Sequence, residues 1–138
     1  MTKIAITGSN GRMGQALIEA VKLNPNVSQG SILNRGDDIK GVLKGFDVLI
    51  DFTRPEATLD ALSTCQSAGK AMVIGTTGFS DDALKVIDQA SSDIPIVFAP
   101  NMSVGVNLTL KLLETTAKVI GADSNIEIVE THHSHKVD

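Results

Sequence analysis

The sequence lacks the features of several protein classes. Among its 138 residues there is one cysteine, Cys65, so an intrachain disulfide is excluded and a reducing compartment is indicated. No apolar run approaches the roughly 20 residues of a membrane-spanning helix, and the first residues lack the basic and apolar regions of a signal peptide. The net charge of −4 argues against general binding to nucleic acid or to a membrane surface. We therefore expect a cytoplasmic protein.

Two common catalytic signatures are also missing. The chain has neither the Gly-x-Ser-x-Gly elbow of serine hydrolases nor a Walker-type phosphate loop, and it has no internal repeat or low-complexity tract. With 42% hydrophobic and 20% charged residues, the composition is that of a globular chain with its own core. Cys65 lies in a helical pattern, so we interpret it as a small apolar residue that is buried or half-buried.

Strand and helix patterns alternate along most of the chain, with a short irregular or helical link at residues 40–44. This alternation predicts an α/β fold, namely a Rossmann-type, doubly wound parallel sheet with helices on both faces. We expect strands at 3–7, 29–34, 46–52, 71–74, 94–99 and 125–131, and helices at 12–23, 55–68, 81–91 and, capped by Ser103, up to about 120.

Three glycines stand between the first expected strand and the first expected helix, with the spacing Gly8-x-x-Gly11-x-x-Gly14. Glycine allows a sharp turn and a close approach of phosphate to the backbone, and the N-terminus of the helix attracts the negative charge. The first gap is one residue longer than in the usual G-x-G-x-x-G motif. The alternative is an ordinary glycine-rich turn, but the position directly after a first strand favours a dinucleotide site.

Polar or glycine-rich loops follow the first five expected strands, at 8–14, 34–35, 53–54, 75–78 and 99–102. The carboxyl ends of parallel strands meet at one edge of the sheet, where such folds bind their ligands. We therefore expect the five loops to form one extended cofactor groove. Loops are generally polar, but that alternative does not explain short turns built from glycine and threonine.

Asn34 lies where dinucleotide folds often place an acid, about 20 residues beyond the glycines, to bind the ribose hydroxyls. Asparagine does not repel a 2′-phosphate, and the following Arg35 can pair with one. This pair favours NADPH without excluding NADH. The alternative is a turn with a solvated arginine.

A polar cluster at residues 132–136 contains His132, His133 and Lys136. In a strand or in a helix, His132 and Lys136 can face one substrate, and they suit an anion that must gain a proton. Three histidines within four residues also raise the alternative of a metal ion. The ligand spacing of a closed zinc site is absent, so we expect no metal site. A second alternative is a polar tail without fixed structure.

Five segments, residues 8–14, 51–55, 75–79, 99–107 and 130–138, stand in order along the chain. Together they resemble one enzyme family, 4-hydroxy-tetrahydrodipicolinate reductase, also called dihydrodipicolinate reductase, of the diaminopimelate route to lysine. The last of them, Glu-Thr-His-His-Ser-His-Lys-Val-Asp, is highly specific, and the glycine loop is much less so. The resemblance implies a reductase that uses NADH or NADPH on a cyclic imine dicarboxylate and that assembles as a homotetramer.

The resemblance also assigns roles to residues. His132 resembles the family's proton donor and acceptor, Lys136 its proton donor, and His133 a substrate ligand. Asn34 and Arg35 would meet the adenosine ribose or its phosphate. The residues expected at the pyrophosphate are Gly8, Ser9, Asn10, Gly11, Arg12 and Met13, and those expected beside the nicotinamide are Gly75, Thr76, Thr77, Ala99, Pro100, Asn101 and Met102.

The family pattern divides the chain into a dinucleotide-binding domain at 1–102 and the start of an α+β substrate-binding and tetramerisation domain at 103–138. Family members continue with Pro-Ser-Gly-Thr, so we expect that this chain is a fragment. Two other classes are a dinucleotide-binding module without turnover and a different Rossmann enzyme, such as a homoserine or semialdehyde dehydrogenase. The cluster at His132 to Lys136 suits neither of them.

Overall fold

The computed structural model describes residues 1–131 and divides the chain into two compact units, the first Met1–Pro100 and the second beginning at Asn101. The first unit contains a five-stranded sheet in which all neighbouring strands are parallel, in the order β2-β1-β3-β4-β5. Its elements are β1 (Thr2–Thr7), α1 (Arg12–Leu23), β2 (Val27–Leu33), the 3-10 helix η1 (Lys40–Gly45), β3 (Val48–Asp51), α2 (Pro55–Ser67), β4 (Ala71–Ile74), α3 (Asp81–Ala90) and β5 (Ile96–Phe98).

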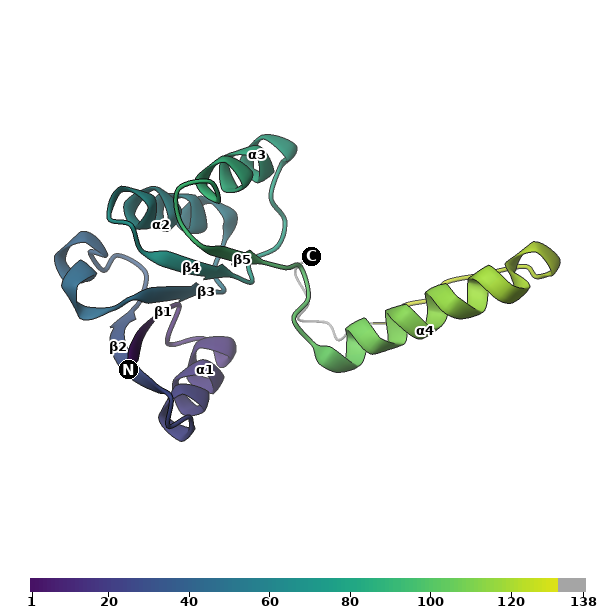
Figure 1. Ribbon diagram of the computed structural model, residues 1–138, viewed down its shortest axis with the longest axis horizontal. Helices are drawn as coiled ribbons and strands as arrows, with labels where there is room; N and C mark the ends of the chain where they lie inside the picture. Colours follow the sequence, from purple (N-terminus) through teal and green to yellow (C-terminus); the bar gives the residue numbers. More distant parts are fainter. Residues whose placement is uncertain (132–138) are drawn as a thin grey trace. The chain divides into compact units, whose positions relative to one another are not determined.

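Helices cover both faces of this sheet, with α1 on one face and α2 and α3 on the other (Figure 1). On the α1 face, Ile18 and Val21 pack against Ile4 and Ile6 of β1. On the opposite face, the larger cluster gathers around residues such as Leu49, which is fully buried. Burial of apolar side chains on both faces stabilises a parallel sheet, and the predicted Rossmann-type architecture is confirmed.

Local sequence signals fix where the helices begin. Proline stands at the first position of α2, where its missing N–H costs no hydrogen bond. Ser80 caps α3 by accepting a hydrogen bond at Oγ from the Ala83 N–H (3.3 Å), and two acids in the first turn complement the helix dipole.

The connection between β2 and β3 is short and passes close to β2. A Cβ atom added to Gly30 of β2 would lie 2.7 Å from the Gly45 carbonyl oxygen and 3.2 Å from Cβ of Phe46. Glycine at position 30 therefore lets this link run close to the sheet, and Phe46 is then buried in the larger core cluster.

The structure confirms the interpretation of Cys65 as a buried apolar residue. It lies in α2 with no exposed surface. Burial raises the pKa of its thiol to about 11, and the negative charge of Asp51 adds to this effect while Lys70 opposes it. The thiol therefore stays protonated near neutral pH and packs as a small apolar group.

The second unit contains α4 (Val104–Ile120) and the 3-10 helix η2 (Gly121–Asp123). Ser103 caps α4 by accepting a hydrogen bond from the Val106 N–H (3.3 Å). The strand predicted at 125–131 is wrong, because these residues have no regular secondary structure. Their alternating apolar pattern suits a strand, but no strand among the described residues of this unit is available to pair with it. No helix within residues 1–131 is long and apolar enough to cross a membrane.

Candidate functional site

The glycine-rich loop joins β1 to α1 in a form that requires glycine. Gly8 has φ of +67°, which other residues rarely adopt. A Cβ atom on Gly14, in the first turn of α1, would lie 2.3 Å from the Gly8 carbonyl oxygen and 2.6 Å from Cα of Ser9. The helix therefore packs directly against the loop backbone, as in dinucleotide-binding folds.

Hydrogen bonds hold this loop to the end of β2. The side-chain oxygen Oδ1 of Asn34 accepts from the Ser9 hydroxyl (2.8 Å) and from the Asn10 N–H (3.1 Å). On the other side of the loop, Nε2 of Gln15 donates to the Ser9 carbonyl oxygen (2.7 Å). Asn34 thus positions the glycine loop, a structural role that its sequence position did not indicate.

The N-terminus of α1 is open to an anion. Its N-cap is Gly11, which has no side chain to cap the helix. The first backbone N–H groups of an α-helix have no partner inside the helix, so they can bind a phosphate. A hollow of about 530 Å³ lies at this point and is lined by Gly8, Gly11, Arg12, Met13, Gly14 and Phe52.

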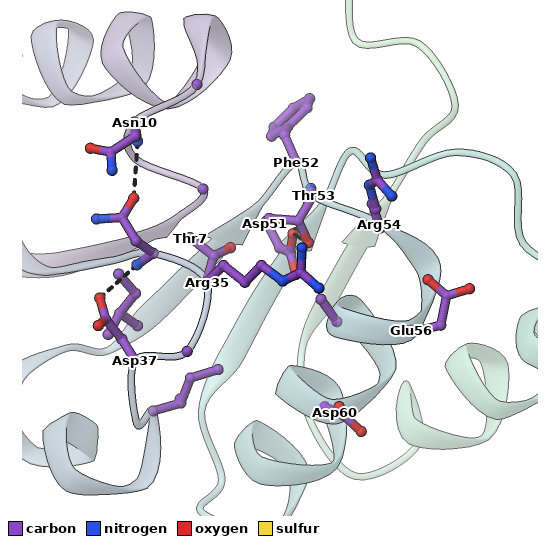
Figure 2. Close-up of a pocket in the computed structure, with 17 residues that line it drawn as sticks. Thr7, Asn10, Arg35, Asp37, Asp51, Phe52, Thr53, Arg54, Glu56 and Asp60 are labelled. Carbon is purple, nitrogen blue, oxygen red and sulfur yellow. Dashed lines mark hydrogen bonds between the residues drawn. The ribbon is translucent and has the colours of Figure 1, made fainter. Parts of the chain in front are cut away.

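A larger groove of about 990 Å³ lies at the carboxyl ends of β1, β2 and β3 (Figure 2). Figure 2 shows Arg35 extending into it from the loop after β2, and Arg54 comes from the start of α2. Neither arginine makes an ion pair within residues 1–131. The lining residues are Thr7, Gly8, Asn10, Gly11, Leu33, Asn34, Arg35, Gly36, Asp37, Ile39, Asp51, Phe52, Thr53, Arg54, Glu56, Ala57 and Asp60.

The structure brings some of the predicted cofactor residues together. Gly8, Asn10, Gly11, Asn34 and Arg35 line the larger groove. Arg12 and Met13 line the hollow at the start of α1. Ser9 is the buried residue of the glycine loop, only 2% exposed, and it lines neither hollow.

Three further predicted residues follow β4 and lie outside the groove lining. Gly75, after β4, packs against the Phe52 ring, because a Cβ atom there would lie 2.0 Å from Cε1 of that ring. Thr76 is buried, whereas Thr77 is exposed. None of these three threonine and glycine residues lines either hollow.

Residues 99–102 span the junction of the two units. Ala99 and Pro100 follow β5 in the first unit. Asn101 begins the second unit, where its side-chain oxygen accepts a hydrogen bond from the Ser103 N–H (2.8 Å), and Met102 is exposed. Asn101 thus shapes the turn that leads into α4.

The predicted substrate-side residues His132, His133 and Lys136 lie outside the described residues. No group of three or more potential metal ligands occurs within residues 1–131. The expectation that the three histidines form no metal site therefore stays a prediction.

Sequence reasoning missed a buried polar network at the base of the groove. Asp51 is 1% exposed, and its Oδ1 accepts hydrogen bonds from the N–H (2.8 Å) and the hydroxyl (2.6 Å) of Thr53. Thr76 Oγ1 accepts from the Thr53 N–H (2.9 Å) and from the Thr58 hydroxyl (2.9 Å). The network ties the loops after β3 and β4 to α2. The signal was present in the segment Asp-Phe-Thr-Arg-Pro, which the resemblance included without assigning roles.

Together, the glycine loop, the open helix N-terminus and the groove at the strand ends define the class of Rossmann-type nucleotide-binding domains. The family model "Dihydrodipicolinate reductase, N-terminus" matches residues 2–102. The chain belongs to the dihydrodipicolinate reductase family.

Two individual proteins with names from this family are similar to the chain. A 4-hydroxy-tetrahydrodipicolinate reductase of Hahella chejuensis is 47% identical over 161 aligned positions, which cover 100% of this chain and 60% of that protein. The structure of a dipicolinate-bound dihydrodipicolinate reductase from Paenisporosarcina sp. TG-14 has a TM-score of 0.68 and 26% identity, covering 85% of this chain and 54% of the other. The chain thus spans little more than half the length of these relatives.

A further solved structure supports the fold alone. A candidate NADPH-dependent oxidoreductase from Desulfitobacterium hafniense has a TM-score of 0.59 at 13% identity, covering 71% of this chain and 34% of its own. Identity this low carries no argument about chemistry.

Proposed function

We propose that the chain is the nucleotide-binding part of an oxidoreductase that reduces 4-hydroxy-tetrahydrodipicolinate with NADH or NADPH in lysine biosynthesis. The observation that carries the proposal is the close packing of Gly14 against the Gly8 backbone, where a Cβ atom added to Gly14 would lie 2.3 Å from the Gly8 carbonyl oxygen. This contact keeps the loop and helix close enough for backbone N–H groups to bind a pyrophosphate. The relatives bear names of the same reductase.

The residues present fit a nicotinamide dinucleotide. The pyrophosphate would bind at Gly8 to Met13, where the helix N-terminus is uncapped. Asn34 and Arg35 would hold the adenosine ribose or its phosphate at the end of β2. The cofactor, when bound, would supply the hydride. Residues 75–77 and 99–102 remain proposed for its nicotinamide side.

The substrate side is proposed from the polar cluster at His132 to Lys136. Lysine and histidine would bind a dicarboxylate, and His133 would contribute to holding it. His132 and Lys136 would deliver a proton as negative charge develops on the substrate. On this proposal, residues 1–102 form the dinucleotide-binding domain of a cytoplasmic homotetramer. Residues 103–138 begin its substrate-binding and tetramerisation domain, and neither nucleic acid nor a membrane takes part.

We expect the 138-residue chain to bind NADPH, because the groove and the glycine loop lie within its first unit. Titration followed by nicotinamide fluorescence should saturate, and calorimetry should give the same dissociation constant. Circular dichroism of the same sample must show that it is folded. A folded sample that binds neither NADPH nor NADH at millimolar concentration would contradict the proposal.

Replacing Arg35 by alanine should weaken NADPH binding selectively. Arg35 lines the groove and makes no ion pair within residues 1–131, so its guanidinium is available for the 2′-phosphate. Loss of a charge-assisted hydrogen bond costs about 1.5–3 kcal/mol. Calorimetry with each cofactor measures the effect, with NADH as the internal control. Equal losses for NADPH and NADH would mean that Arg35 does not contact the 2′-phosphate.

A further inference from the structure

The position that usually carries the ribose-binding acid holds Asn34, and its amide oxygen is already engaged. Oδ1 accepts from the Ser9 hydroxyl and from the Asn10 N–H, which uses both lone pairs of that oxygen. Asn34 can then offer a ligand only the donors of its NH₂ group. The two hydroxyls of a ribose also donate protons, which an NH₂ group cannot accept, so a second side chain with a free acceptor oxygen would complete the ribose site.

Asp37 supplies a carboxylate at the same place. It lies in the loop after β2 and lines the groove, as Figure 2 shows. Its Oδ2 accepts a hydrogen bond from the Asn34 N–H (2.7 Å), which anchors the carboxylate three residues beyond the expected position. Among residues 1–131, Oδ1 of Asp37 has no hydrogen bond and pairs with no cation. Asp37 therefore offers an anchored carboxylate, with one oxygen not used within residues 1–131, in the lining of the groove that also contains Arg35.

We propose that Asp37 is the acid that binds the adenosine ribose and that it opposes Arg35 in setting the preference between NADH and NADPH. The proposal rests on the function proposed above. With NADH, the Asp37 carboxylate accepts hydrogen bonds from the 2′- and 3′-hydroxyls. With NADPH, the 2′-phosphate brings negative charge towards that carboxylate, while Arg35 attracts it. The two side chains thus act in opposite directions on one substituent of the cofactor.

The test is the variant Asp37→Asn in the 138-residue chain. Asparagine keeps the shape of aspartate and can still accept from the Asn34 N–H, so the loop should keep its conformation. We expect NADH to bind more weakly and NADPH more tightly, with a shift of about tenfold in the ratio of their dissociation constants. Asp37→Ser, which also removes the charge, should shift the ratio in the same direction.

Asp38→Asn is the matched control. It removes the same charge one residue away, but Asp38 does not line the groove and instead accepts a hydrogen bond from the Lys40 N–H (2.9 Å). We expect its ratio to stay within about twofold of the wild-type value, because an exposed charge outside the contact is screened by solvent and salt.

The outcomes separate the two proposals. If the wild-type chain binds both cofactors and the ratio is unchanged in Asp37→Asn, or changes equally in Asp38→Asn, the role of Asp37 is overturned and the proposed function stands. If the folded wild-type chain binds neither cofactor, the proposed function fails and this inference fails with it. Competition with 2′,5′-ADP and with 5′-AMP must reproduce the shift, since these probes fill only the adenosine side.

Discussion

Replacing Gly14 by alanine is expected to reduce NADPH affinity by about 100-fold and to destabilise the first unit by about 1–3 kcal/mol. The added Cβ would lie 2.3 Å from the Gly8 carbonyl oxygen and 2.6 Å from Cα of Ser9. Both neighbours are backbone atoms, so no flexible side chain can move aside. The helix must shift away from the loop, and the N–H groups that would bind the pyrophosphate shift with it. Calorimetric titration and thermal unfolding measure the two effects.

Gly105→Ala provides a control for this substitution. Gly105 also lies in the first turn of a helix, α4, but an added Cβ would meet its nearest atom, Oγ of Ser103, at 3.9 Å. We expect NADPH affinity to be unchanged in this variant, because alanine is a better helix former than glycine and causes no clash. A Gly14→Ala variant with wild-type affinity would remove the glycine loop from the proposed site.

Replacing Lys136 by alanine is expected to lower kcat by about 10²–10⁴-fold, the usual effect of losing a positioned general acid. The dissociation constant of NADPH should change little, because the glycine loop and the groove lie in the first unit. The chain spans 60% of its Hahella relative, so the assay uses a chimera that continues after Asp138 with the corresponding residues of that protein. Loss of nicotinamide absorbance with fresh substrate reports turnover.

The chimera with Lys136 retained must be active, and Lys85→Ala serves as the matched control. Lys85 is an exposed lysine that pairs with Asp82 on the surface of α3 (2.8 Å), so its removal should leave kcat unchanged. Wild-type turnover by the Lys136→Ala chimera would exclude this lysine from the mechanism.

The sequence predicted the first unit well because its signals are local. The glycine spacing, Pro55 and Ser80 each mark the start of a helix through backbone geometry or capping. The helix at Arg12–Leu23 matches its expected bounds. The strands β3 and β5 are shorter than their apolar runs, because only residues with a partner on a neighbouring strand join the ladder. The strand expected at 125–131 fails for the same reason.

The site was predictable only in part. Spacing located the glycine loop, Asn34 and Arg35, because dinucleotide folds repeat those intervals. It could not show that Asn34 also holds the glycine loop, since that role depends on a hydrogen bond to Ser9, 25 residues away in the sequence. The network around Asp51 was missed because its partners come from separate loops that only the folded sheet brings together.

The contact between Gly75 and Phe52 has a consequence for anyone who re-engineers this protein. A Cβ atom at position 75 would lie 2.0 Å from the Phe52 ring, and the Thr53 N–H donates a hydrogen bond to the Thr76 hydroxyl. The loops after β3 and β4 therefore pack as one unit. Grafting either loop alone from another enzyme would leave a clash or a gap. The two loops are therefore one unit of design, and transplants should carry both.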